Sequence, residues 1–168
     1  MQVRLLPDKF SPSMAAGRRF DMTTQIAHIS ELQGRIGEEI AISPWRTVLQ
    51  EDIDVFAEVT GDQQWIHVDP DRSARESPFG TTVVHGFLTL SLLTEMMTQA
   101  IRIDGLKMAI NYGFNRVRFT SPVPSGSQLR TRLTLGAYET SDTGIQVTWH
   151  CHIECQGHDR PACIAEWL

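Results

Sequence analysis

The sequence predicts a single α+β domain in which a buried helix is followed by antiparallel strands. Three observations carry this prediction: the length of 168 residues fits one domain, apolar residues recur at helical spacing up to about residue 103, and they alternate with polar residues beyond it. Helices followed by a run of strands are typical of α+β architectures. The composition, 41% hydrophobic and 21% charged, is that of an ordinary folded domain.

Two short helices are predicted before the most apolar part of the chain. Apolar residues recur at helical spacing over residues 51–60, and Gly61 is expected to end that helix in the left-handed conformation that glycine adopts without steric cost. A second helix is expected to begin at Asp69 and Pro70, because an N-cap residue is followed there by proline at the first helical position. The segment 62–67 is therefore predicted to be a loop just past a helix end.

The most apolar stretch of the chain predicts a third helix over residues 87–103. Its apolar residues surround more than one face, so this helix should be largely buried. A length of roughly 17 residues is marginal for a membrane span, and polar residues such as Thr94 and Glu95 within it exclude that reading.

The C-terminal half changes to the period of two that is typical of strands. In its longest alternating run, Trp149, Cys151 and Ile153 share one face, while His150 and His152 share the other. The predicted strands cover residues 112–119, 129–135, 145–155 and 164–168.

Charge and composition exclude several classes of protein. A net charge of −5 offers no basic face for nucleic acid, and no apolar run is long enough to cross a membrane. Residues 1–27 are expected to be a loosely ordered extension before a domain of residues 28–168. The extension lacks the continuous apolar core of a secretory signal, and three cysteines do not make a disulfide framework, so the cytoplasm is the expected location.

Asp62 and His67 are the first candidates for chemistry. A carboxylate and an imidazole on one short loop can converge on a single water, one removing a proton while the other gives or holds another. Five residues of separation are compatible with this geometry but do not require it. The alternative is that Asp62 caps a turn and His67 is a half-exposed loop residue.

The second candidate is the stretch Val84-His85-Gly86 at the head of the predicted buried helix. A helix N-terminus offers unpaired backbone N–H groups and the positive end of a dipole, which can stabilise a negative oxygen. Glycine also lets a ligand approach the backbone closely. The alternative is a plain helix entry.

In this order, the two elements resemble a known family. Gly61-Asp62-Gln63-Gln64-Trp65-Ile66-His67-Val68-Asp69-Pro70, followed by Phe79-Gly80-Thr81-Thr82-Val83-Val84-His85-Gly86 and an apolar helix, is similar to the MaoC-like hydratases, the (R)-specific enoyl-CoA hydratases. The wording is closest to the NodN-like, single-domain bacterial branch, as is the later stretch from Asn111 to Phe119. The resemblance covers about residues 28–168.

The resemblance implies a hot-dog fold, in which a curved antiparallel sheet wraps a long central helix, and a homodimer. It implies reversible hydration of trans-2-enoyl-CoA to (R)-3-hydroxyacyl-CoA, with Asp62 and His67 as the catalytic pair and the Gly86 amide in an oxyanion hole. Thr94 stands where many relatives have a serine and is given a supporting role. Coenzyme A would be part of the substrate, and neither a metal nor another cofactor is expected.

The chain departs from the commoner family wording Gly-Asp-x-Asn-Pro-x-His at Gln64 and Trp65. Gln64 could still orient a water or the Asp62 carboxylate, which gives it a second supporting role. Two other functions stay open: an acyl-CoA thioesterase on the same scaffold, and a protein that binds acyl thioesters without turning them over.

Other side chains offer weaker candidates. Cys151 and Cys155 could suggest zinc, but on a strand they would lie about 13 Å apart, too far to share an ion. Buried cysteines acting as small apolar side chains are the preferred interpretation. Four arginines on the predicted strands could bind the phosphates of coenzyme A or lie on solvated faces: Arg116, Arg118, Arg130 and Arg132.

Overall fold

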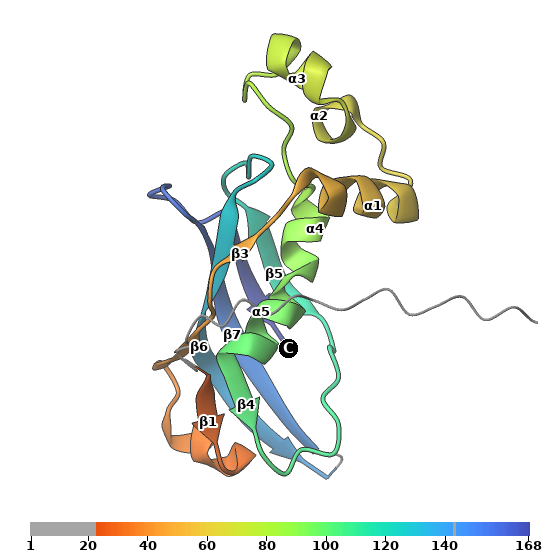
Figure 1. Cartoon of the computed structure of the whole chain (residues 1–168). Coiled ribbons are helices and arrows are strands. Elements are labelled where there is room, and N and C mark those ends of the chain that lie inside the picture. The colour runs from red at the N-terminus through yellow and green to blue at the C-terminus, as the bar shows by residue number, and fades with distance from the viewer. Residues whose placement is uncertain (1–22, 143) are drawn as a thin grey trace, which may run out of the picture.

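The computed structural model describes residues 23–142 and 144–168. An antiparallel sheet forms one layer, and two consecutive helices run along one of its faces (Figure 1). Three further helices lie together at one end of the molecule, while a small two-stranded sheet lies at the other end (Figure 1). The α+β architecture predicted from the sequence is confirmed.

The main sheet has the spatial order β2-β6-β7-β8-β5, and β3 also pairs with β6. All of these pairings are antiparallel. A separate parallel pair joins β1 to β4. The strands are β1 (Thr24–Ile26), β2 (Glu39–Ile42), β3 (Arg46–Thr47), β4 (Ile101–Ile103), β5 (Phe114–Phe119), β6 (Gln128–Ser141), β7 (Gly144–Cys155) and β8 (Cys163–Trp167).

The core lies between the inner face of the sheet and the helix α5 (Leu93–Ala100), which contacts β6. Met96 of α5 and Leu133 of β6 are fully buried there. Each such side chain contributes roughly 1.5–3 kcal/mol through burial of apolar surface. The alternation predicted for residues 145–155 is confirmed from Trp149 to Cys155, where Cys151 is buried while its neighbour His150 is exposed, but it is wrong at the start of the strand, where Ile145 is 43% exposed and Thr148 is buried.

The three cysteines are free thiols buried on strands, as the sequence indicates. Burial raises the pKa of the Cys151 thiol to about 12 and that of Cys163 to about 11. Zinc binds the thiolate form, which burial disfavours here, so these side chains act as small apolar groups.

The helices at the end of the sheet are α1 (Gln50–Thr60), α2 (Trp65–Val68) and α3 (Pro70–Glu76). Gly61 caps α1 with φ of 76°, and its N–H donates to the carbonyl of Ala57, so the predicted left-handed cap is confirmed. Asp69 caps α3, because its carboxylate accepts from the N–H of Arg72 at 2.9 Å. The segment between the two caps is consequently held at both ends.

The single helix predicted over residues 87–103 is wrong in its extent. Helix α4 (Gly86–Ser91) and helix α5 are separated at Leu92, and residues 101–103 form strand β4 instead. The β-branched side chains of Ile101 and Ile103 favour the extended conformation, and pairing with β1 supplies backbone hydrogen bonds that the helix would have made. Tyr112, the first residue of the strand predicted over residues 112–119, lies outside β5 and is 76% exposed.

Residues 1–22 of the expected N-terminal extension lie outside the described residues. Its last part, Thr24–Ile26, belongs to the fold as β1. Among the helices that the structure describes, we find no span long and apolar enough to cross a membrane.

Candidate active site

Asp62 is the first residue beyond the glycine cap of α1. Its backbone N–H lies 3.4 Å from the Thr60 hydroxyl, and the residue is exposed to solvent. The left-handed conformation of Gly61 turns the chain away from the helix axis at this point. Asp62 therefore presents its carboxylate from a short loop on a rigid base.

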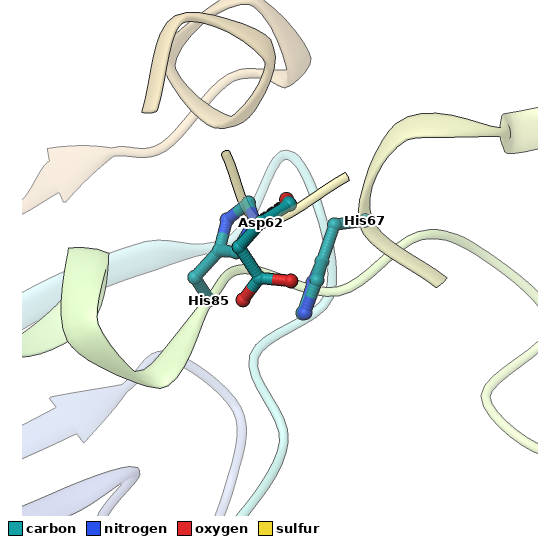
Figure 2. Close-up of side chains that lie close together, drawn as sticks. All are labelled: Asp62, His67 and His85. Atoms are coloured by element: carbon teal, nitrogen blue, oxygen red, sulfur yellow. Dashed lines mark hydrogen bonds between the residues drawn. The ribbon is translucent and has the colours of Figure 1, made fainter. Parts of the chain in front are cut away.

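His67 lies five residues further on, in α2, and is 8% exposed. Its Nδ1–H donates to the backbone carbonyl of Val83 at 2.6 Å, because a carbonyl can only accept. This bond leaves Nε2 of the neutral ring as a free acceptor. The Asp62 carboxylate points toward that side of the ring (Figure 2), and the two side chains have ligand atoms within 4.8 Å of each other.

The pKa of His67 is held below its ordinary value of 6.5. Burial is the largest cause, since it disfavours the charged imidazolium, and the nearby His85 acts in the same direction. The hydrogen bond to Val83 and the negative charge of Asp62 oppose this shift without cancelling it. His67 is consequently neutral near pH 7, as a proton acceptor must be.

Backbone contacts fix the position of His67. The Ile66 carbonyl accepts from the N–H of Val83 at 2.9 Å, next to the bond from the His67 ring to the same residue. The Gln50 amide donates to the His67 carbonyl at 2.7 Å, and its own oxygen accepts from Thr82 at 2.5 Å. These contacts tie α2 to the start of α1 and to the strand-like segment before α4.

His85 is a member of this cluster to which the sequence analysis assigned no role. It is 2% exposed, its ring stacks on that of His67 at 3.8 Å between centroids, and its Nε2 donates to the backbone carbonyl of Asp62 at 3.0 Å. The sequence places His85 only in the stretch before Gly86. A histidine beside the first glycine of an apolar helix is the one signal that could have drawn attention to it.

Gly86 opens α4 and lines a cavity of about 320 Å³. A Cβ at this position would lie 3.0 Å from the ring of Phe119, so the absence of a side chain lets the ring approach the helix start. Val84 and Gly86, which flank His85 in the chain, both line the cavity. The remaining lining residues are Thr89, Phe119, Thr120, Ser121, Pro122, Val123 and Ala162.

The two supporting residues expected from the sequence are less closely involved. Gln64 is exposed and precedes α2, where its backbone carbonyl accepts from the N–H of His67 at 2.9 Å. Thr94 is exposed on α5, and its carbonyl accepts from the Thr98 hydroxyl. Among the described residues, no hydrogen bond joins either side chain to Asp62 or His67.

Asp62, His67 and His85 are also the described residues whose ligand atoms could together approach a metal ion. One nitrogen of each imidazole is already used in a hydrogen bond to a carbonyl. The rings are stacked with only 25° between their planes, so their in-plane lone pairs run side by side and do not converge. This arrangement suits an acid–base site better than a shared ion.

The arginines divide into two groups. Arg130 and Arg132 both donate to Glu154, at 2.6 and 2.7 Å, and form ion pairs across the strands of the sheet. Arg116 and Arg118 lie on β5, which is an edge strand of the sheet, and Arg116 is exposed. Two of the four arginines considered as phosphate ligands, Arg130 and Arg132, are therefore already paired with a carboxylate.

Known proteins share both the sequence and the fold. A family model described as the MaoC like domain matches residues 31–153. The 3-hydroxyacyl-thioester dehydratase Z of Mycobacterium tuberculosis is 46% identical over 139 residues, which cover 82% of this chain and 91% of that protein. Nodulation protein N of Rhizobium leguminosarum bv. viciae is 44% identical over 142 residues, which cover 83% of this chain and 88% of that protein.

Solved structures establish the fold. The unliganded R-hydratase PhaJ1 from Pseudomonas aeruginosa matches with a TM-score of 0.64 at 22% identity, over 79% of this chain and 78% of its own. The (R)-hydratase from A. caviae matches with a TM-score of 0.63 at 22% identity, over 79% of this chain and 92% of its own. The fold is therefore the hot-dog fold that the sequence predicted.

Proposed function

The chain belongs to the MaoC-like dehydratase family, and from that premise we propose that it reversibly hydrates trans-2-enoyl-CoA to (R)-3-hydroxyacyl-CoA. The family supports the broader statement that the protein is a hydro-lyase acting on an acyl thioester. One observation carries the finer proposal: the Asp62 carboxylate and the free Nε2 of His67 face each other beside the start of α4.

In the proposed reaction, a water molecule lies between the two side chains. Nε2 of His67 accepts one hydrogen bond from the water, and the Asp62 carboxylate accepts the other. His67 takes a proton as the water oxygen bonds to the β-carbon of the substrate, and this proton is then delivered to the α-carbon on the same face. Water is the only reactant added, and the pair returns to its starting protonation state.

The thioester carbonyl would lie against the amide of Gly86. Attack at the β-carbon moves negative charge onto this oxygen, and an N–H at the start of α4 can stabilise it. The cavity beside Gly86 and Phe119 offers a space of about 320 Å³ next to this point. Neither Asp62 nor His67 lines this cavity, but Val84 and Gly86 do, and His85 between them stacks on His67, which supports a substrate that extends from the cavity to the pair.

The proposal is tested with Asp62→Asn and His67→Ala, assayed on crotonyl-CoA by loss of the enoyl absorbance. Each change should lower kcat by about 10²–10⁴-fold, which is the usual contribution of a positioned acid or base. Circular dichroism and the melting temperature check that both variants remain folded. Near-normal turnover by either variant would overturn the assignment.

The same samples separate the two competing functions. Release of free thiol from saturated acyl-CoA would indicate a thioesterase, whereas binding without any change of substrate would indicate a non-catalytic binding protein. Gln64→Ala serves as the comparison within the loop, because its side chain makes no hydrogen bond to the pair among the described residues. We expect it to change kcat less than tenfold, in contrast to the two variants of the pair.

We also propose a homodimer. The segment before β5 carries four apolar side chains at alternate positions that are between 44% and 76% exposed: Leu106, Met108, Ile110 and Tyr112. Exposed apolar surface of this kind is typical of a protein interface. Because β5 is the edge strand of the main sheet, a second copy could cover both the edge and these side chains.

A further inference from the structure

His85 contacts both members of the proposed catalytic pair. Its Nε2 donates to the backbone carbonyl of Asp62 at 3.0 Å, and its ring stacks on that of His67 with 3.8 Å between centroids and 25° between planes. Phe56 of α1 packs near the same ring, 5.1 Å away and tilted by 50°. His85 therefore lies between the end of α1, the loop after it and helix α2.

The hydrogen bond fixes which nitrogen of His85 carries a proton. Because the Asp62 carbonyl can only accept, Nε2 is the protonated atom and Nδ1 of the neutral ring is a bare acceptor. This Nδ1 is buried and has no hydrogen-bond partner among the residues that the structure describes. A buried polar atom without a partner is unfavourable, so packing alone would favour an apolar side chain here.

We propose that His85 is a positioning residue, which holds the Asp62 backbone through Nε2 and supports the His67 ring by stacking. The role rests on the proposed function, because it matters only if Asp62 and His67 act together on one water. His85 does not itself touch the reacting atoms in this proposal. It sets the separation and the relative orientation of the two groups that do.

The loop that carries Asp62 has few other hydrogen bonds to hold it, which is the physical basis of this role. Asp62 is exposed, and among the described residues its backbone N–H makes a single long contact, 3.4 Å to the Thr60 hydroxyl, so the bond from His85 is what holds its carbonyl. The His67 ring is fixed at Nδ1 by Val83 but could still rotate about that bond. The stacked ring of His85 opposes this rotation, since it packs against one face of the imidazole.

Two substitutions separate the two contacts. His85→Phe keeps a flat ring beside His67 but removes the donor to Asp62, whereas His85→Gln keeps a donor and removes the ring. We expect His85→Phe to lower kcat by about 10–100-fold with KM changed less than about twofold, because misplacement of a reacting group acts on turnover. His85→Gln should recover part of the loss, since it restores the tether to Asp62.

A matched control excludes a general loss of stability. Ile153→Val removes one methylene from the fully buried position on β7, far along the chain from the site, and should lower the melting temperature while leaving kcat unchanged. A kcat that follows melting temperature across all of these variants would show a merely structural role. Unchanged kcat in His85→Phe would also overturn the proposal.

A measurement without substrate distinguishes this inference from the proposed function. The ring nitrogens of His67, observed by ¹⁵N NMR, should show the Nδ1–H tautomer in the unchanged protein and a mixture in His85→Ala. If the unchanged protein fails to hydrate enoyl-CoA but the tautomers change as expected, the function fails and the positioning role stands. If hydration occurs and neither tautomer nor kcat depends on His85, only the positioning role fails.

Discussion

At the scale of single residues, opposing effects on His67 determine what it can do. Burial and the neighbouring His85 disfavour its charged form, while Val83 and Asp62 favour it. The first effects are stronger, so the pKa of His67 lies below 6.5 in the folded protein. An imidazole of ordinary pKa would be partly charged just below neutral pH, and its charged fraction could not accept a proton from water.

The lowered pKa of His67 predicts how activity depends on pH. Because His67 accepts a proton in its neutral form, kcat/KM for hydration should remain on its plateau as the pH falls through 6.5 and decline only below it. A pH profile of kcat/KM measured from about pH 5 to 8 checks this expectation. A decline already centred above 6.5 would contradict the assignment of His67 as the acceptor.

The lowered pKa of His67 also predicts how the free energy of unfolding depends on pH. The unfolded chain binds a proton at His67 near pH 6.5, whereas the folded chain binds it only at lower pH, so the free energy of unfolding falls as the pH decreases below 6.5. The contribution is fully present above that pH. In His67→Gln this part of the pH dependence should disappear, which thermal melts at several pH values would show.

Single residues also mark the limit of prediction from the sequence. Asp62, His67 and Gly86 could be named as candidates in advance because each belongs to a motif to which the family resemblance assigns a role. The contacts of His85 could not be, because a stacking distance of 3.8 Å between residues 67 and 85 arises only when two separate segments fold together. The hydrogen bond from Gln50 to the His67 carbonyl depends in the same way on the packing of α1 against α2.

At the scale of elements, the caps were predictable and the continuity of the long helix was not. Gly61 and Pro70 act through their own backbone conformations and Asp69 through its own carboxylate, so local sequence determines where α1 ends and α3 begins. The extent of the helix after Gly86 depends instead on β1, a distant segment that pairs with residues 101–103. Periodicity within 87–103 contains no information about that partner.

The start of α4 yields a prediction with a matched control. Gly86→Ala would place a Cβ 3.0 Å from the Phe119 ring, so the ring or the helix start must shift by a few tenths of an ångström. If the Gly86 amide stabilises the thioester oxygen, the added methyl group and the displaced Phe119 ring, which both line the cavity beside that amide, should lower kcat/KM for hydration by about tenfold. Gly34→Ala, where a Cβ meets nothing within 4 Å, should leave kcat/KM and the melting temperature unchanged.

Crotonyl-CoA turnover and thermal melting of the two alanine variants make this comparison. Because Phe119 is 46% exposed, its ring has room to move, and Gly86→Ala should cost little stability. A loss of turnover with a preserved melting temperature is therefore the expected pattern. Unchanged turnover in Gly86→Ala would place the thioester oxygen away from the start of α4.

At the scale of the whole molecule, one edge of the sheet carries a run of exposed apolar side chains. The segment before β5 is joined to Leu168, the residue after β8, by backbone bonds of Tyr112 and Gly113, yet its apolar side chains face solvent. Met108 and Ile110 are 72% and 68% exposed, although burial of such a side chain contributes roughly 1.5–3 kcal/mol. The proposed homodimer would bury them.

Substitution of this surface tests the homodimer. The unchanged protein should elute with twice the chain mass of 18.9 kDa in size-exclusion chromatography with light scattering, and Met108→Glu combined with Ile110→Glu should elute at 18.9 kDa. Two carboxylates buried in an apolar interface oppose association, whereas on a monomer they remain solvated. Ile36→Glu, which changes a 55% exposed apolar residue in the turn after the 3₁₀ helix at Ile29–Gly34, should leave the mass unchanged. A single mass of 18.9 kDa for the unchanged protein at micromolar concentration would contradict the dimer, and an unaltered dimer mass in the double variant would place its interface on another surface.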